Sequence, residues 1–373
     1  MIISFICCWI PVGGAETPLL NTIWISVFIF IFFASYTMCL IAFYGSLSTV
    51  CTDEPQRLRV SSYKSFFDTI GYCIVYALLP IFIGKGINIR TVCLVCSPLL
   101  LTMLIPLFMI KEGDKYGQGK DYLPEAKTSF RDSLRITLSN RLFLRWAVPN
   151  ACAYFGLNMF LAAQNALISG LMNLSAGYAA ILNACAFGPV PIMLAIYYKM
   201  MATKGIRFSY RLALGSFAIA ILNFCIASEY IMPHNMTARV IIGCIGSVCG
   251  SFGIGAFFAM PFMMPAQIAA MEFKVTGKDH TAMYFAIQSL IASVMAAVST
   301  GLVYEQLKNL VSDKVIDGVA VAGETWKIGG SLVPVIVSAA CIFGIIMAGK
   351  LPKQYTEEIV SEEMQAIENR RKK

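Results

Sequence analysis

Long apolar stretches alternate with short polar segments along most of this chain. Nine stretches of 15 or more residues contain no Asp, Glu, Lys or Arg. A helix crosses the hydrocarbon core of a bilayer when about 20 consecutive residues are mostly apolar. One stretch, 146–198, is long enough for two such helices, with a turn over 169–177 between them. The pattern therefore predicts an all-α polytopic membrane protein with about ten transmembrane helices.

The expected spans are 1–14, 21–49, 66–84, 91–110, 146–168, 178–198, 210–228, 240–264, 281–303 and 328–349. The first is the shortest. It is expected to be a hydrophobic helix whose beginning is missing rather than a signal peptide, because no Lys or Arg precedes residue 57. Within the eighth span, Gly246 and Gly250 form a GxxxG step, which predicts a close approach to a neighbouring helix.

The polar segments between these spans differ strongly in basic residues. One set of segments contains 23 Lys and Arg, whereas the segments that alternate with it contain 6. The first set comprises 50–65, 111–145, 199–211, 265–280 and the tail from 350. Basic residues are concentrated in cytoplasmic loops. The first set is therefore predicted to be cytoplasmic, with both termini on that side and the protein in the plasma membrane.

Composition excludes several other classes. The chain is 58% hydrophobic and only 13% charged, unlike a soluble domain. Its net charge of +8 reflects the loops and does not indicate nucleic acid as a partner. The 13 cysteines lie mostly within apolar stretches and the chain has two histidines, so packing explains them better than a metal site. Phosphate-binding and Ser–His–Asp motifs are lacking, so neither an enzyme nor a cofactor is expected.

The longest internal polar segment, 111–145, divides the chain. Four spans precede it in an incomplete amino-terminal bundle, 1–110, and six follow in a carboxy-terminal bundle, 146–349. Its stretch 129–145 has helical apolar spacing and is expected to lie along the cytoplasmic face, although a solvated linker is the alternative. The charged tail, 350–373, is expected to be helical and cytoplasmic, without chemistry of its own.

Two loop segments carry a more specific signal. Residues 44–58 are YGSLSTVCTDEPQRL, with Asp53 and Arg57, and residues 63–67 are YKSFF. Residues 265–278 are PAQIAAMEFKVTGK, with Pro265, Glu272 and Gly277, followed by AMYF at 282–285. Both segments resemble cytoplasmic loops of the glycoside–pentoside–hexuronide cation symporters, the melibiose permease-like family of the major facilitator superfamily.

The resemblance implies a two-bundle transporter of sugars or glycosides, with Na⁺ or H⁺ as the coupling ion. It also implies that the family's first two helices are absent, so that the chain has a 4 + 6 arrangement. The family's acidic position in its fourth helix corresponds to Leu40, and the basic position before Phe66 corresponds to Ser65. These departures argue against cation coupling in the family's manner.

Polar residues within the spans are candidates for a substrate site. Asp68 is the ionisable residue expected inside a span, either as a cavity ligand or as a helix-end carboxylate paired with Lys64. Asn150, Tyr154 and Asn158, continued by Asn165, recur at helical spacing. They could line a cavity for hydroxyl-rich solutes or bond between helices.

Two tyrosines complete the candidate substrate site. Tyr36 and Tyr44 share a helix face, and Tyr44 matches a family aromatic that stacks on sugar. Asn183 is a single polar residue in another span and is expected to serve packing.

The sequence therefore predicts a secondary transporter of a small polar solute, most simply a sugar or glycoside, that works by alternating access. The alternative is a truncated or degenerate relative that does not transport and acts as a scaffold or sensor, or a gene fragment. The expected partners are the solute and the lipid bilayer. The sequence assigns no oligomeric state.

Overall fold

The structure is a computed structural model, which describes residues 1–10, 12–13, 17–45, 54–109, 129–278, 280–310, 312–316, 319–322 and 330–372. It forms two compact units. The first comprises Met1–Thr52 and Phe82–Glu125, and the second comprises Asp53–Ile81 and Ala126–Lys373. Most of α4, which the sequence assigns to the amino-terminal half, therefore belongs to the second unit.

The first unit consists of helices. They are α1 (Ile2–Cys8), α2 (Pro18–Gly45), α5 (Ile89–Cys96), the 3₁₀ segment η1 (Ser97–Leu104) and α6 (Ile105–Met109). The indole of Trp24 on α2 donates a hydrogen bond of 3.0 Å to the carbonyl oxygen of Cys7. The ring centres of Phe5 and Phe32 lie 5.7 Å apart. These contacts fasten α1 to α2. The helix within the expected span 1–14 has seven residues and ends at Cys8.

The expected span 91–110 is divided into three helical pieces. Pro98 is the second residue of η1 and Pro106 lies in α6. Proline lacks the backbone N–H that a continuous helix needs, so it disturbs the hydrogen-bond ladder. The apolar pattern of this segment therefore predicts its helicity but not its breaks.

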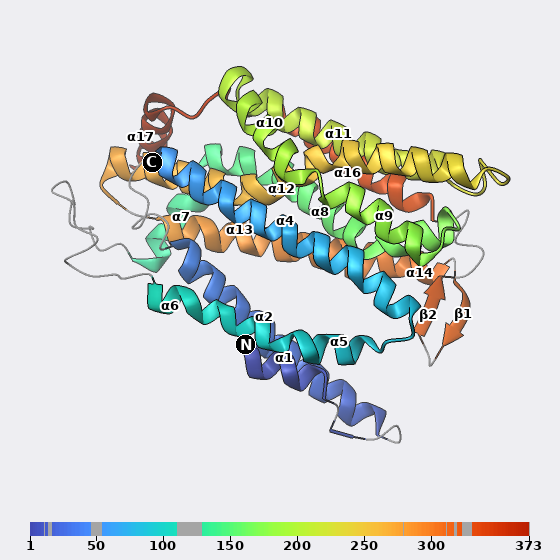
Figure 1. The fold of residues 1–373 in the computed structure, drawn as a ribbon. Helices are drawn as coiled ribbons and strands as arrows, with labels where there is room; N and C mark the ends of the chain where they lie inside the picture. Colours follow the sequence, from blue (N-terminus) through green and yellow to red (C-terminus); the bar gives the residue numbers. More distant parts are fainter. Residues whose placement is uncertain are drawn as a thin grey trace. The chain divides into compact units, whose positions relative to one another are not determined.

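The second unit holds the remaining elements. They are α4 (Glu54–Gly84, of which residues beyond Ile81 belong to the first unit), α7 (Phe130–Ser139), α8 (Arg141–Ala166), η2 (Leu167–Leu171), α9 (Ala176–Phe187), α10 (Val190–Lys204), α11 (Ile206–Ile226), α12 (Met236–Thr276), α13 (Thr281–Ala296), η3 (Ala297–Tyr304), α14 (Glu305–Leu310), β1 (Ser312–Ile316), β2 (Val319–Ala322), α16 (Leu332–Ala348) and α17 (Glu357–Lys372). Helices α8, α11, α12 and α16 run lengthwise beside one another (Figure 1).

Two helices begin or end away from the expected positions. The amphipathic stretch 129–145 is not one helix, because it breaks at Asn140, which caps the start of α8. The expected loop 265–280 is mostly helix, since α12 continues as far as Thr276. Pro265 therefore lies inside a helix rather than in a loop. Between α14 and α16, β1 and β2 form an antiparallel hairpin in the predicted external segment.

Six helical segments among the described residues are long and apolar enough to cross a membrane by length and composition, namely 18–43, 141–171, 177–204, 206–226, 236–276 and 281–310. Two shorter apolar helices cover 89–104 and 332–348. The helices of the second unit enclose a core of aromatic and aliphatic side chains. Its largest fully buried members include Trp146, Tyr197, Tyr210, Phe217 and Phe224.

Small residues bring α11 and α12 close together, as the GxxxG step predicts. A Cβ atom added at Gly246 would lie 2.8 Å from the Cβ of Asn223, and one at Gly250 would lie 2.9 Å from the Cβ of Ala220. Helix backbones approach this closely only where the facing residues lack side-chain volume. The predicted close approach is confirmed, and the partner is α11.

Candidate functional site

Four polar or aromatic residues follow one face of α4. Lys64, Asp68, Tyr72 and Tyr76 are spaced four apart, so their side chains leave the helix on the same side. We call them the α4 stripe. Lys64 forms an ion pair with Asp68, and its ammonium nitrogen lies 5.6 Å from the ring centre of Phe262 on α12. The stripe therefore faces α12 at its charged end.

Asp68 does not lie at a helix end. Because α4 begins at Glu54, Asp68 lies near the middle of a 31-residue helix. The helix dipole acts within the first turn, so the interpretation of Asp68 as a dipole-stabilised terminal carboxylate is wrong. The predicted pairing with Lys64 is confirmed. The Asp68 side chain keeps 36% of its surface exposed.

The aromatic end of the stripe joins three helices. The ring of Tyr72 lies 4.7 Å from that of Phe258 on α12, and the ring of Tyr76 lies 5.3 Å from that of Phe187 on α9. The rings in each pair are inclined by 18° and 24°, so both pairs are stacked. We call these four residues the ring stack. Offset stacking of this kind stabilises helix contacts beyond the area that it buries.

An amide cluster adjoins the ring stack. It consists of Gln164 and Asn165 on α8 and Asn183 on α9. The side-chain nitrogen of Asn183 donates a hydrogen bond of 2.7 Å to the carbonyl oxygen of Tyr76, while its oxygen accepts one from Gln164. Gln164 and Asn183 are buried, and the side-chain oxygen of Gln164 has no partner among the described residues. Asn183 thus joins α4, α8 and α9.

The sequence pattern predicts a packing role for Asn183 and does not distinguish Gln164, Tyr72 or Tyr76 as site residues. The residues come from three separate helices, of which α4 is far from α8 and α9 in the chain, so their proximity has no local signal. Tyr72 and Tyr76 continue the four-residue spacing of Lys64 and Asp68, and this spacing could have indicated one continuous helix face.

The residues of the expected polar stripe on α8 do not share one site, because they bond to different partners. Asn150 is fully buried and accepts a hydrogen bond of 3.4 Å from the hydroxyl of Tyr210 on α11. The amide of Asn158 donates to the carbonyl oxygen of Tyr154, four residues earlier in its own helix, at 2.8 Å. Asn165 belongs to the amide cluster, where Asn183 donates a hydrogen bond to it at 3.5 Å.

The two tyrosines predicted on α2 belong to the first unit. Tyr36 stacks on Phe32, with ring centres 6.1 Å apart and planes inclined by 11°. The backbone of Tyr44 lies in the last turn of α2, and its side chain is outside the described residues. A role for either residue in substrate binding stays a prediction.

The loop motifs are described in part. Asp53 is outside the described residues, and Arg57 lies in α4 by its backbone, without a described side chain. Gly277 has a φ of +70°, and its N–H bonds to the carbonyl oxygen of Phe273 at 2.8 Å. Glycine adopts this left-handed conformation readily at a helix end. The expected glycine turn is therefore present after α12.

Glu272 is the centre of a buried polar network. One carboxylate oxygen lies 2.7 Å from Nδ1 of His280, and the other accepts a hydrogen bond of 2.6 Å from the hydroxyl of Tyr284. The side chains of Glu272 and His280 are each only 1% exposed. Asn140 donates to the same hydroxyl at 2.6 Å. We call these four residues the Glu272 network.

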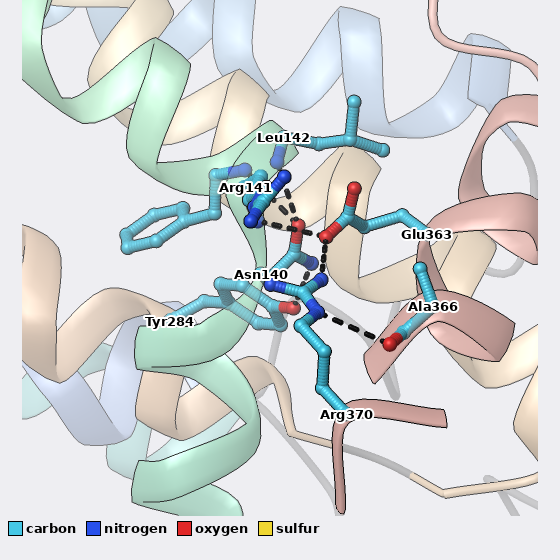
Figure 2. A network of polar contacts seen from close by, with 8 residues as sticks. Asn140, Arg141, Leu142, Tyr284, Glu363, Ala366 and Arg370 are labelled. Carbon is cyan, nitrogen blue, oxygen red and sulfur yellow. Dashed lines mark hydrogen bonds and ion pairs between the residues drawn. The ribbon is translucent and has the colours of Figure 1, made fainter. Parts of the chain in front are cut away.

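Asn140 connects the Glu272 network to the start of α8. Its side-chain oxygen accepts hydrogen bonds from the N–H groups of Leu142 and Phe143, at 3.0 and 3.2 Å. Unpaired N–H groups at a helix start need such a cap. Figure 2 shows Asn140 between Tyr284 and this first turn. One side chain therefore caps α8 and holds α13 beside it.

The tail helix α17 packs on the same end of the unit. Glu363 accepts a hydrogen bond of 3.3 Å from the N–H of Arg141 and pairs with Arg370 at 2.6 Å (Figure 2). The hydroxyl of Tyr355, just before α17, donates to the carbonyl oxygen of Leu142 at 3.4 Å. Burial raises the pKa of the Tyr355 hydroxyl above its usual range. The tail is helical, as predicted, and is fastened to α8.

Comparison with known proteins supports one family. The family described as MFS/sugar transport protein matches residues 1–346 of this chain. The match spans both units and includes α4, the ring stack, the amide cluster and the Glu272 network. A comparison with curated proteins finds no match.

Proposed function

Since this chain belongs to the MFS/sugar transport protein family, we propose that it carries a sugar or glycoside through the membrane by alternating access. Family membership and the apolar helices establish an integral membrane protein of a sugar-transporting family. The melibiose permease-like subfamily, the plasma membrane as location and cytoplasmic termini are parts of the proposal. They rest on the loop motifs and on the distribution of basic residues.

The observation that carries the proposal is the meeting of the ring stack and the amide cluster at Tyr76. A sugar presents apolar C–H faces and hydroxyl groups that both donate and accept hydrogen bonds. Aromatic rings suit the first, and amides suit the second because each has a donor and an acceptor. Ligand sites are commonly apolar with a few converging polar groups.

The position of this site also fits transport. By sequence, α4 belongs to the amino-terminal half, whereas α8, α9 and α12 belong to the carboxy-terminal half. Transporters built from two repeats bind substrate where the repeats meet. Between α4 and these helices the contact consists of stacked rings and the hydrogen bond from Asn183 to Tyr76, and it can separate and re-form as the halves rock. We therefore propose the α4 contact with α9 and α12 as the substrate site.

Replacement of Asn183 by leucine tests this site. Leucine has a similar volume but removes the hydrogen bonds to Gln164 and Tyr76, and the amide available to a sugar hydroxyl. We expect the KM for sugar uptake to rise about five- to tenfold, since one hydrogen bond contributes about 1–1.5 kcal/mol. Ser338→Ala is the control, because Ser338 donates to the carbonyl oxygen of Ala218 between α16 and α11. Equal KM values in the two variants would contradict the assignment.

Asp68→Asn is expected to slow uptake about tenfold while leaving membrane insertion intact. The substitution removes the negative charge beside Lys64, and a hydrogen bond to a charged group contributes about 1.5–3 kcal/mol. Initial uptake rates in proteoliposomes measure the effect, with surface-accessible protein as the reference.

Glu305→Gln provides a matched control for Asp68. Glu305 pairs with Lys308 at 2.8 Å on α14, so this variant also removes one carboxylate from an ion pair within a helix. We expect its uptake to be unchanged. An unchanged rate in Asp68→Asn would show that the Lys64–Asp68 pair serves only the helix and has no part in transport or in ion coupling.

A further inference from the structure

Helix α7 has two contrasting faces. Ser133, Ile136 and Thr137 are buried against the rest of the second unit, in which α7 contacts α8 and α13. Arg131, Arg135 and Leu138, at i, i+4 and i+7, are exposed on another face. Their angular positions on a helix fall within about 60° of one another. The solvent-accessible face of α7 is therefore both basic and apolar.

The first turn of α8 repeats this arrangement. Arg141, Leu144 and Arg145 are exposed at i, i+3 and i+4. These residues begin the segment 141–171, which is long and apolar enough to cross a membrane. They therefore lie where that helix leaves the hydrocarbon region, at the depth of the lipid headgroups. We call the six exposed residues of α7 and α8 the arginine face.

The guanidinium groups of the four arginines have no acidic partner among the residues that the structure describes. Two other basic residues at this end of the unit are paired, since Lys274 contacts Glu357 at 2.9 Å and Arg370 contacts Glu363. Between residues 130 and 145 the chain has four Arg and one Asp, which gives a local charge of +3. The arginine face is thus left with unneutralised charge.

Exposed apolar side chains accompany this charge. Phe130 at the start of α7 is 74% exposed, and Leu138 is 48% exposed. Large apolar side chains beside unpaired arginines are unfavourable in water but suited to the boundary between headgroups and acyl chains. A peripheral protein partner would satisfy the charge but would not explain why the face lies directly beside a membrane-spanning segment.

We propose that the arginine face binds the headgroup of an anionic phospholipid. The guanidinium groups match phosphate oxygens in shape and charge, and bind them with two parallel hydrogen bonds. Phe130, Leu138 and Leu144 lie between the upper parts of the acyl chains. The basic-residue distribution puts this face on the cytoplasmic side, where acidic lipids are enriched.

The competing explanation is that these arginines only set the orientation of the helices during insertion. In that case, removing any exposed basic residue on the same side would have the same effect, because acidic lipid would attract all of these residues equally. Lys199 on α10 and Arg211 on α11 are exposed residues in another predicted cytoplasmic segment. Removing their charges lowers the net charge of the protein by the same amount, so they provide a matched control.

The test compares Arg131→Gln/Arg135→Gln with Lys199→Gln/Arg211→Gln in the full chain. Purified protein in neutral detergent is titrated with phosphatidylglycerol or phosphatidylcholine, and the melting temperature is recorded at each lipid concentration. We expect phosphatidylglycerol to stabilise the wild-type and control proteins. The double variant on α7 should need about tenfold more of this lipid for the same shift.

Two results would overturn the proposal. One is an equal response of the α7 variant and the control to phosphatidylglycerol. The other is that phosphatidylcholine stabilises the wild-type protein as much as phosphatidylglycerol does, which would show that any lipid can occupy this surface. No sugar is present in this assay, so its outcome is separate from that of the transport proposal.

Discussion

Replacement of Glu272 by leucine is expected to lower the stability of the protein by about 3 kcal/mol or more. Leucine leaves the imidazole of His280 without its one hydrogen-bond partner among the described residues, because Nε2 of that ring is already unpartnered. It also removes the acceptor for the Tyr284 hydroxyl. A buried polar group without a partner costs about 1–3 kcal/mol, and breaking a buried pair costs about 3–5 kcal/mol.

The loss should extend beyond Glu272 itself. Tyr284 also contacts Asn140, and Asn140 caps α8, so the network joins the ends of α12, α13 and α8. The effect is measured as a change in the melting temperature in detergent, where unfolding is detected by the loss of monodisperse protein. The control is Glu357→Gln, which removes a carboxylate from an exposed ion pair with Lys274 at the same end of the unit. Exposed pairs contribute little, so its melting temperature should hardly change. Equal melting temperatures for the two variants would show that the Glu272 network does not stabilise the fold.

Gly253→Val is expected to disrupt the packing of α11 on α12. A Cβ atom at this position would lie 2.7 Å from the carbonyl oxygen of Ala213 and 2.7 Å from the Cβ of Phe217. Real Cβ atoms do not approach other atoms this closely, and both neighbours are held by the α11 helix. Forcing extra volume into a close-packed core costs about 1–3 kcal/mol. Because valine is branched at Cβ, we expect its cost to reach or exceed the upper end of this range.

The yield and melting temperature of folded Gly253→Val protein report this cost. Gly215→Ala on α11 is the control, because the nearest atom to an added Cβ there is 3.8 Å away. Alanine favours a helix over glycine by about 0.5–1 kcal/mol, so this variant should be as stable as the parent or slightly more so. If Gly253→Val were as stable as Gly215→Ala, the close approach of the two helices would be contradicted.

The apolar pattern predicted the helices well because a membrane requires each span to satisfy its own backbone hydrogen bonds. It could not predict where they break. Asn140 interrupts the expected helix 129–145 because its side chain caps α8, and Pro98 divides the span 91–110. Conversely, α12 continues past Pro261 and Pro265 to Thr276. Such differences depend on neighbouring helices, which hydropathy does not describe.

The candidate site was less predictable than the fold. The pairing of Asp68 with Lys64 followed from spacing within one helix and is confirmed. The contact of Asn183 with Gln164 and Tyr76 depends on how three separate helices pack, so a single polar residue in a span gave no sign of it. Glu272 was selected for its loop motif, whereas its burial and its bond to His280 appeared only in the structure.

The most direct test of the account is uptake of sugars by proteoliposomes that contain this chain. Radiolabelled neutral glycosides, pentosides and hexuronides are supplied with and without Na⁺ or H⁺ gradients, and correct insertion is confirmed by protease protection. We predict saturable uptake of at least one sugar, with a KM that rises in Asn183→Leu and not in Ser338→Ala. Inserted protein that takes up no member of the panel under any gradient would contradict transport and favour a relative that does not transport.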